Sequence, residues 1–451
     1  MTGESLYWLF VLLTFFYIVY KNRNSSLKIL IILCFYIGLA SSFGKVIENP
    51  YKIILVLFSL YILQKKNGLS GLNKREIHLL FIFILFSTSL LYSAFTNGDY
   101  FKLVFSQYGK YVTPVCLFFI FNQMQIKNPG AFVNLKDLFF SLLTIQIFLS
   151  VVKILTIGLT EFVVGSIAYN GGGVATIVPV LGFILVWLDR QGDIKRKDWL
   201  YVLLLIVIGF TSYKRAIWFI MPVFIFLFSY YVPRKMKVSN FLYFLPIIPI
   251  IFYFGVRLSP TLNREGKIGG SFDWQYVLEY AQNYSFGNTS ETYGTHSGQG
   301  RGGATLLLWE KLFNEKTLTF NDYWGFGLRE FYTTDYEHFN EEKFGINSKG
   351  AASGLFQSYI SSGYIGVFVT ILLLISILSL IKEPRIRLTI GLLVFWDYFF
   401  YSGLILKTPS LFILFSYIIA YSNLQFDQRL YRKYSSLRLR DKKKNLKPQT
   451  I

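Results

Sequence analysis

Residues 199–232 read WLYVLLLIVIGFTSYKRAIWFIMPVFIFLFSYYV, an apolar run interrupted in its middle by Lys214 and Arg215. As a single helix the run would be about 51 Å long at about 1.5 Å per residue. That length exceeds the roughly 30 Å hydrocarbon core of a bilayer, even for a tilted helix. We therefore expect a break near residues 209–214 and a helical hairpin that crosses a membrane twice.

The whole chain shares this apolar character. It is 53% hydrophobic and 19% aromatic, with a mean hydropathy of +0.44, and one soluble core cannot bury so much apolar surface. The sequence therefore predicts an all-α polytopic membrane protein with about 12–14 transmembrane helices, the range reflecting one short candidate, 51–63. The candidate crossings are 5–20, 27–43, 51–63, 77–95, 102–121, 138–158, 174–188, 199–211, 215–232, 241–256, 354–381, 385–404 and 408–424.

Basic residues concentrate in short loops between the apolar runs. The chain has a net charge of +20, but residues 257–353 carry −3 and the remainder +23. Lys and Arg in short loops mark the cytoplasmic side of a membrane protein, whereas nucleic-acid binding would need one continuous basic face, so no nucleic-acid partner is expected. The basic segments are 21–28, 64–76, 189–198, 233–237, 382–387 and 429–447.

These assignments divide the chain into four regions and leave one large external loop. They are N-terminal transmembrane helices (1–256), the external loop (257–353), C-terminal transmembrane helices (354–424) and a basic cytoplasmic tail (425–451). The external loop should contain an amphipathic helix from Ala304, because Leu308, Trp309, Leu312 and Phe313 form one stripe. Arg301 should lie just ahead of the start of that helix.

Three cationic side chains should stand on the external side of the membrane. Lys214 and Arg215 lie at the tip of the hairpin, against the charge rule that the other loops obey, and such charges indicate function. Snorkelling to lipid phosphates explains Lys214 equally well. Arg215 falls in the first turn of a new helix, where free backbone N–H groups favour anions and a guanidinium binds phosphate in bidentate fashion. Arg215 and Arg301 together would fit a pyrophosphate.

The rest of the external loop offers acids, one histidine and aromatic side chains. Arg329 adds another guanidinium, and His338 lies in an acidic, aromatic neighbourhood that could make it a base, although a lone loop histidine is usually only solvated. The aromatic side chains suit sugar stacking but equally suit an interface without ligand. The candidate bases are Asp322, Glu330, Asp335 and Glu337, and the candidate stacking residues are Trp324, Tyr332 and Tyr336.

No motif indicates a metal or a nucleotide. The spacings H-x-x-x-H and C-x-x-C are absent, and Cys34 and Cys116 both lie in apolar runs. Gly298, Gly300 and Gly303 match G-x-G-x-x-G, but no strand precedes them, so this match does not predict a dinucleotide site. Neither a metal nor another cofactor is expected.

The order of motifs over residues 199–381 resembles the superfamily of Wzy-type O-antigen polymerases and O-antigen ligases. An arginine at the outer turn of a hairpin is followed by a G-R-x(7)-W motif, by G-x-G with an aromatic residue, and by x-G-x-x-G at a loop-to-helix junction. The residues that carry this order are Arg215, Gly300, Arg301, Trp309, Gly325, Gly327, Phe331, Gly363 and Gly366. Ligases have a His-Asn pair just before the helix that leaves the external loop. At that place this chain has Ala352 and Ser353, and this difference favours the polymerase branch.

The resemblance implies a GT-C-type glycosyltransferase of the bacterial inner membrane. Its donor would be an oligosaccharide on undecaprenyl pyrophosphate, its reaction the joining of repeat units without a metal, and its partner a regulator of chain length. Arg215 and Arg301 match the arginines thought to bind the pyrophosphate.

Two other classes remain open. An O-antigen ligase or another lipid-linked-sugar transferase would differ in its acceptor. A transporter or flippase would place charges near the bilayer midplane, where Lys110, Lys153 and the break at 169–179 keep that alternative open. A scaffolding protein would leave the external arginines unexplained.

Overall fold

In the computed structural model, the helices are the only extended secondary structure among the described residues. Within them the only β-type pairing is an isolated bridge between Val164 and Ala168. The all-α class is therefore confirmed for this part of the chain. The described residues are 2–67, 69–99, 101–160, 163–169, 173–212, 216–233, 247–286, 301–314, 318–328 and 353–445.

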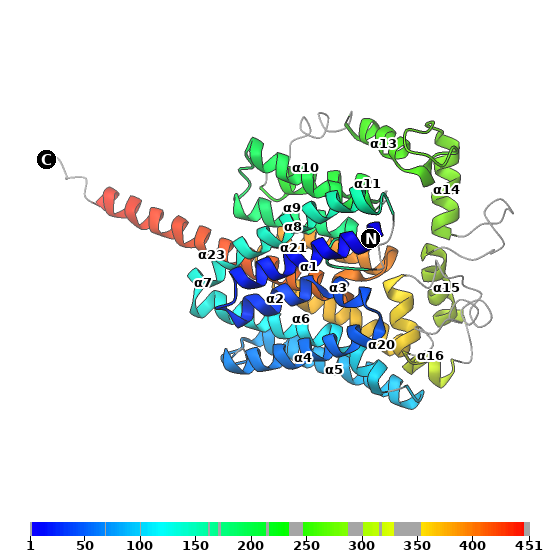
Figure 1. Cartoon of the computed structure of the whole chain (residues 1–451). Helices are drawn as coiled ribbons and strands as arrows, with labels where there is room; N and C mark the ends of the chain where they lie inside the picture. The colour runs from blue at the N-terminus through cyan, green and yellow to red at the C-terminus, as the bar shows by residue number, and fades with distance from the viewer. Residues whose placement is uncertain are drawn as a thin grey trace.

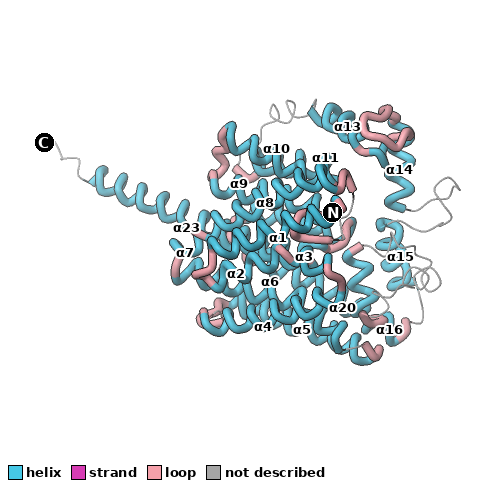
Figure 2. Tube along the Cα trace, in the orientation of Figure 1, coloured by secondary structure: helices cyan, strands magenta, loops and turns pink. Residues whose placement is uncertain are grey.

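The first part of the chain runs back and forth through a bundle, with its loops gathered at the two ends (Figures 1 and 2). Its helices follow the predicted crossings closely. They are α1 (Gly3–Lys21), α2 (Ser26–Phe35), α3 (Ile37–Ser42), α4 (Lys45–Lys65), α5 (Lys74–Thr96), α6 (Phe101–Lys127), α7 (Pro129–Val133), α8 (Leu135–Thr156), α9 (Val174–Asp189), α10 (Arg196–Thr211), α11 (Ala216–Phe226) and the π-helix η1 (Leu227–Tyr231).

The second part adds a group of short helices at one end of the bundle and then returns into it. The long last helix continues past the bundle on the opposite side (Figure 1). These elements are α13 (Ile247–Leu258), the 3-10 helix η2 (Pro260–Leu262), α14 (Trp274–Phe286), α15 (Arg301–Asn314), α16 (Phe320–Trp324), α20 (Gly354–Ser379), α21 (Pro384–Phe395), the π-helix η4 (Trp396–Phe400), α22 (Leu404–Lys407) and α23 (Pro409–Asn445).

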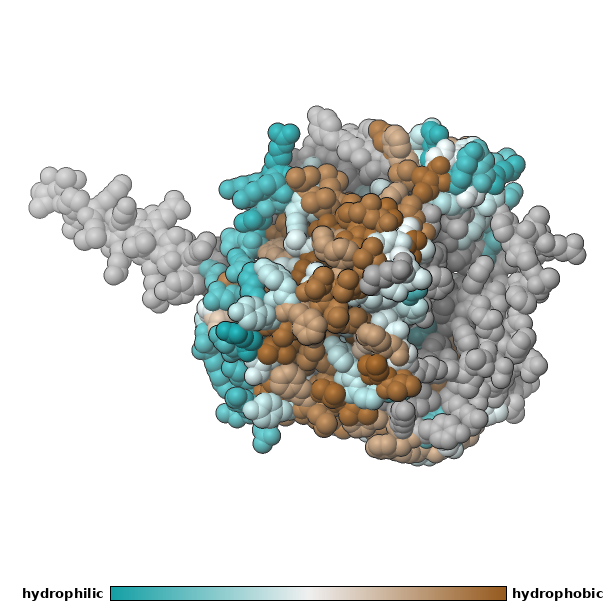
Figure 3. Space-filling view, viewed as in Figure 1, coloured by the Kyte–Doolittle hydropathy of each residue, from teal (hydrophilic) through white to brown (hydrophobic). Residues whose placement is uncertain are grey.

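Several helices have the length and the apolar composition of membrane-spanning helices. Five segments are long and apolar enough for this by length and composition. The candidate crossing 51–63 was short, but the helix is longer than predicted. Helix α4 starts at Lys45, continues through Pro50 and ends at Lys65, so it is long enough to span a bilayer. Large apolar side chains on these helices face outward, and the visible surface shows a broad hydrophobic band between hydrophilic edges (Figure 3). The five segments are Gly3–Lys21, Val46–Lys65, Lys74–Thr96, Pro129–Thr156 and Gly354–Ser379.

The predicted break in the run 199–232 is confirmed. Helix α10 ends at Thr211 and α11 begins at Ala216. Buried Lys153 donates to the Thr211 carbonyl at 3.2 Å. Thr211 is the last residue of α10, and a cation is favoured there because the last carbonyl groups of a helix have no partner within the helix. This structural role explains the charge of Lys153 without a transport function.

The basic loops meet at one end of the bundle, which we call the basic end. The Arg75 guanidinium donates to the Ser379 carbonyl at 3.1 Å, and Lys136 pairs with Asp189 at 2.8 Å. Lys382 pairs with Asp427 at 2.6 Å. The ends of α5, α8, α9, α20, α21 and α23 are thus cross-linked by polar contacts. We call the opposite end, which carries α14, α15 and α16, the loop end.

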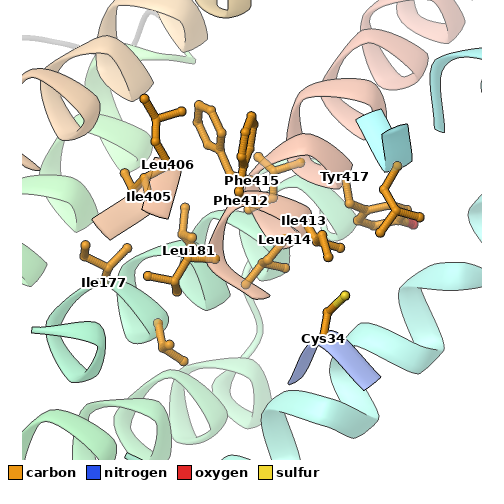
Figure 4. Packing of buried hydrophobic residues seen from close by; sticks show 14 of the residues in the cluster. Cys34, Ile177, Leu181, Ile405, Leu406, Phe412, Ile413, Leu414, Phe415 and Tyr417 are labelled. Atoms are coloured by element: carbon orange, nitrogen blue, oxygen red, sulfur yellow. The ribbon is translucent and has the colours of Figure 1, made fainter. Parts of the chain in front are cut away.

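Two helices lie at the centre of the bundle. Residues 174–188 of α9 are buried on every side, as are residues 410–425 of α23. A helix that is apolar all round is expected in such a central position. Figure 4 shows Leu181 of α9 facing Phe412 and Leu414 of α23. Both cysteines are buried and free, in agreement with their apolar surroundings.

Candidate functional site

A glycine turn docks on the start of α20 at the loop end. The turn follows α16, and its Phe326 N–H donates to the Ile360 carbonyl of α20 at 2.7 Å. On its other side the Asn97 amide donates to the Gly325 carbonyl at 3.2 Å, and the Leu328 N–H donates to the Asp99 carboxylate at 2.6 Å. The turn therefore joins the C-terminal end of α5 to α20.

Two glycines allow this docking because their backbones touch the opposite segment. Gly325 has φ +94°, and a Cβ there would lie 2.5 Å from the Ser362 nitrogen. Gly363 has φ +63°, and a Cβ there would lie 2.3 Å from the Tyr323 carbonyl. These glycines belong to two of the four motifs on which the resemblance rests, so the fold brings those two motifs into direct contact.

Gly363→Ala should destabilise the folded protein by about 1–3 kcal/mol, because φ +63° with ψ −164° is a backbone region essentially restricted to glycine. The Tyr323 carbonyl must also move. Gly391→Ala in α21 is the matched control, since its nearest neighbour to an added Cβ is 3.6 Å away. The control should be neutral or slightly stabilising in a thermal unfolding measurement. Equal melting temperatures for both variants would contradict the docking.

Beside the turn, a buried carboxylate holds α15, α16 and α20 together. Asp322 accepts from the Thr319 N–H at 2.8 Å, from the Thr319 hydroxyl at 2.7 Å and from the Tyr359 hydroxyl, and it pairs with Lys311 at 3.0 Å. Burial raises the pKa of Asp322, but the hydrogen bonds from Tyr359, Thr319 and Lys311 outweigh it and lower the pKa to about 2. Asp322 was a candidate base, but an ionised carboxylate with these hydrogen bonds takes up protons poorly, and its contacts give it a structural role.

The amphipathic helix of the loop is confirmed as α15. Its described part runs from Arg301 to Asn314, so Arg301 lies within the helix rather than ahead of it. Its apolar stripe divides: Leu308 is buried and its carbonyl accepts from the Tyr364 hydroxyl at 2.8 Å, whereas Trp309 and Phe313 stack at 6.0 Å on the exposed side. Such an exposed aromatic pair suits the headgroup level of a membrane.

Under the docked turn lies a small cavity with a polar wall. Its volume is about 40 Å³, enough for a few water molecules. Leu328 of the turn closes one side, and Ser361 and Ser362 of α20 line another. The buried Tyr398 hydroxyl also faces it and makes no hydrogen bond among the described residues, although the Ser358 and Thr370 hydroxyls are its neighbours. The cavity thus places several polar groups around a space that fits water molecules.

A lysine points into this cavity. Lys407 ends α22, in the connection between the bundle helices η4 and α23, and donates to the Gln357 amide oxygen and to the Ser402 carbonyl at 3.3 Å. Burial lowers the pKa of Lys407 to about 7, against the effect of Asp397, which raises it. The Asp397 oxygens accept from the Leu404 and Ile405 N–H groups at 3.0 and 2.8 Å, so this acid also caps α22.

Two further lysines approach the same region from α4 and α6. Lys110 interacts electrostatically with Lys407 and with Lys52. Lys52 forms an ion pair with Glu48. Glu48 and Asp397 are acids that interact with the cluster of Lys52, Lys110 and Lys407. Buried positive charge favours an anionic ligand.

Most residues predicted for the site lie outside the described residues. Trp324 is described: it is half-buried at the end of α16, and its ring lies 4.5 Å from that of Tyr92, so it packs on α5. Of Arg301 only the backbone is described. The predictions for the others stay untested by the geometry. They are Lys214, Arg215, Arg329, Glu330, Tyr332, Asp335, Tyr336, Glu337 and His338.

Lys407 was not among the predicted site residues. A lysine inside the apolar segment FFYSGLILKTPSLFILF (399–415) was a signal available in the sequence, because a buried charge in such a segment indicates a function or a partner. It was overlooked because it falls in the short gap between the candidate crossings 385–404 and 408–424. Comparison with known proteins found no matching family model, no matching curated protein and no matching solved structure.

Proposed function

We propose that this chain is a membrane glycosyltransferase that joins oligosaccharide repeat units carried on undecaprenyl pyrophosphate into a surface polysaccharide. The observation that supports this most is the contact between the Gly325 turn and Gly363 above a cavity that contains Lys407. Two motifs of the polymerase and ligase superfamily thus frame a cationic site. The lysine cluster provides charge for a pyrophosphate that the arginines alone were expected to bind.

The orientation follows from the charges at the two ends of the bundle. Loops rich in Lys and Arg favour the cytoplasmic side, so the basic end faces the cytoplasm and the loop end faces outward. In a bacterium with this donor, the loop end would lie at the outer face of the inner membrane. The exposed pair Trp309 and Phe313 would then sit at the outer headgroup level.

The reaction joins two lipid-linked chains. A sugar hydroxyl of one repeat unit attacks the anomeric carbon of the growing chain, a new C–O bond forms, and the bond to the lipid pyrophosphate breaks. Negative charge grows on the departing pyrophosphate, where fixed cations stabilise the transition state more than the bound substrate. Arg215, Arg301 and Lys407 would provide these cations.

Other residues of the external loop complete this proposal. His338, Asp335 or Glu337 would take the proton of the attacking hydroxyl. Lys214 and Arg329 would bind phosphate oxygens of the lipid-linked sugars. The rings of Tyr332, Tyr336 and Trp324 would stack on sugar faces, and a separate regulator protein would set chain length.

Reconstitution tests this function directly. The purified protein would be placed in liposomes with the undecaprenyl-pyrophosphate-linked repeat unit of its source organism, and the products separated on a gel. We expect a ladder with steps of one repeat unit. If a folded preparation leaves the donor as a single band and instead moves it between leaflets, the transporter alternative replaces the polymerase. Transfer to a lipid A core acceptor would replace it with a ligase.

Lys407→Met should reduce kcat/KM for chain extension about 10- to 100-fold, because one hydrogen bond to a charged group is worth roughly 1.5–3 kcal/mol. Methionine keeps the length and apolar body of the side chain, so the fold should persist. Lys382→Met is the matched control, since Lys382 is exposed at the basic end. If initial rates in liposomes fall equally in both variants, Lys407 has no specific part in the reaction.

A further inference from the structure

A membrane-facing groove runs along α4, α5 and α6. It has a volume of about 500 Å³ and a lining that is almost wholly apolar, with Leu60 from α4, Leu80 from α5 and Val112 from α6 among its walls. It exists because α5 packs mainly on α20, whereas α6 packs mainly on α4 and α23, so consecutive helices α5 and α6 diverge. These helices lie together at the lower edge of the bundle in Figure 1.

The groove is longer than one leaflet of a bilayer. It extends along α6 from Phe105 to Phe119 and ends near Leu69, at the basic end. At about 1.5 Å per residue this stretch of α6 covers about 21 Å, whereas half of a 30 Å hydrocarbon core is about 15 Å. A hydrocarbon chain that fills it must therefore be longer than the acyl chain of a phospholipid confined to one leaflet.

An aromatic layer separates the groove from the cavity that contains Lys407. Phe83 stacks on Tyr108 at 6.4 Å on the groove side, and Phe86 meets Tyr111 edge-on at 5.0 Å on the cavity side. The Tyr108 hydroxyl donates to Ser87 at 2.7 Å and bridges α6 to α5. The same pair of helices thus forms one wall of both spaces, with only side chains between them.

Positive charge lies where the groove approaches the loop end. Gly109 lines the groove, and the next residue is Lys110, which interacts electrostatically with Lys407 and Lys52. A Cβ on Gly109 would lie 2.8 Å from Val56, so the glycine permits the close approach of α4 and α6 at this level. An apolar groove with a cluster of lysines behind one of its walls matches a ligand with a long hydrocarbon chain and a phosphate head.

We propose that the groove between α4, α5 and α6 binds the polyprenyl chain of the donor lipid, with its phosphate head on the side of the lysine cluster. The inference deepens the proposed function and depends on it only for the identity of the lipid. The length of the groove, together with the lysines behind its aromatic wall, favours a long-chain lipid phosphate over ordinary phospholipids.

Photo-cross-linking in liposomes tests the groove without requiring polymerisation. The full chain would carry p-benzoylphenylalanine in place of Leu60, whose side chain lines the groove and is 44% exposed. The control carries it in place of Leu203, which is 60% exposed on α10 and lies away from the groove. Phosphate-labelled undecaprenyl pyrophosphate is the probe. We expect at least fivefold more label at position 60, removed by unlabelled probe but not by phosphatidylglycerol at the same concentration.

Equal labelling of the two positions, or equal competition by phosphatidylglycerol, would overturn the proposal, because the groove would then be ordinary lipid-facing surface. A kinetic readout complements this test: Leu60→Trp should raise KM for the lipid-linked donor at least fivefold with kcat unchanged, whereas Leu203→Trp should change neither. Specific labelling in a protein that forms no polymer would support the groove and contradict the polymerase. A polymer ladder with unselective labelling would support the polymerase and contradict the groove.

Discussion

Arg301→Ala is expected to abolish chain extension, with rates reduced at least about 100-fold, while the protein still folds and inserts. Removing one preorganised donor from a developing negative charge typically costs a factor of 10² to 10³. Arg301 is the first described residue of α15. Arg215→Ala is expected to behave in the same way. Initial rates of ladder formation in liposomes measure both effects.

The control for this prediction comes from the same part of the chain. Arg264 is 59% exposed and pairs with Asp273 at 2.8 Å, so Arg264→Ala removes an arginine of ordinary surface character. Its effect on chain extension should be less than about twofold, because exposed ion pairs contribute little. Normal polymer from Arg301→Ala or Arg215→Ala would remove that arginine from the mechanism. Equal loss in the Arg264 variant would show a general effect of charge or expression.

The helices were predictable because the membrane imposes a length on them. A run such as 199–232 can cross only as a hairpin, and the structure breaks it between Thr211 and Ala216. What the pattern could not show was the extent of α4. Glu48, Asn49 and Lys52 interrupt its apolar run, but Glu48 and Lys52 neutralise each other one turn apart, so the helix continues through them.

The arrangement at the loop end was less predictable, since it depends on contacts between distant segments. Spacing along the chain cannot show that Gly325 meets Ser362 or that Leu328 binds Asp99. Asp322 looked like any other loop acid in the sequence, whereas its partner Tyr359 lies on α20, beyond the stretch of loop that separates them. Whether an acidic side chain such as Asp322 is buried depends on tertiary packing. Burial and the partners that come with it determine whether the acid can act as a base or forms a structural ion pair.

The second large effect is expected for Asp322→Ala, which should destabilise the docking of α15 and α16 on α20 by about 3–5 kcal/mol. Removing one member of a buried ion pair leaves the other charge unpaired. Here Lys311 would lose its carboxylate, with a side chain that is only 17% exposed, and the Tyr359 hydroxyl would lose its acceptor. Thermal unfolding in detergent and proteolysis of the 257–353 segment measure the loss.

Asp427→Ala is the matched control, because its pair with Lys382 is about half exposed and contributes at most about 1 kcal/mol. Replacing both partners distinguishes an ion pair from packing: Asp322→Leu combined with Lys311→Met should recover part of the stability lost in Asp322→Ala, since an apolar pair leaves no buried charge. Equal stability of Asp322→Ala and Asp427→Ala would contradict the buried network. Because Leu328 and Gly325 lie on the same docked segment, loss of this network should also open the Lys407 cavity and reduce chain extension, although Asp322 touches no substrate.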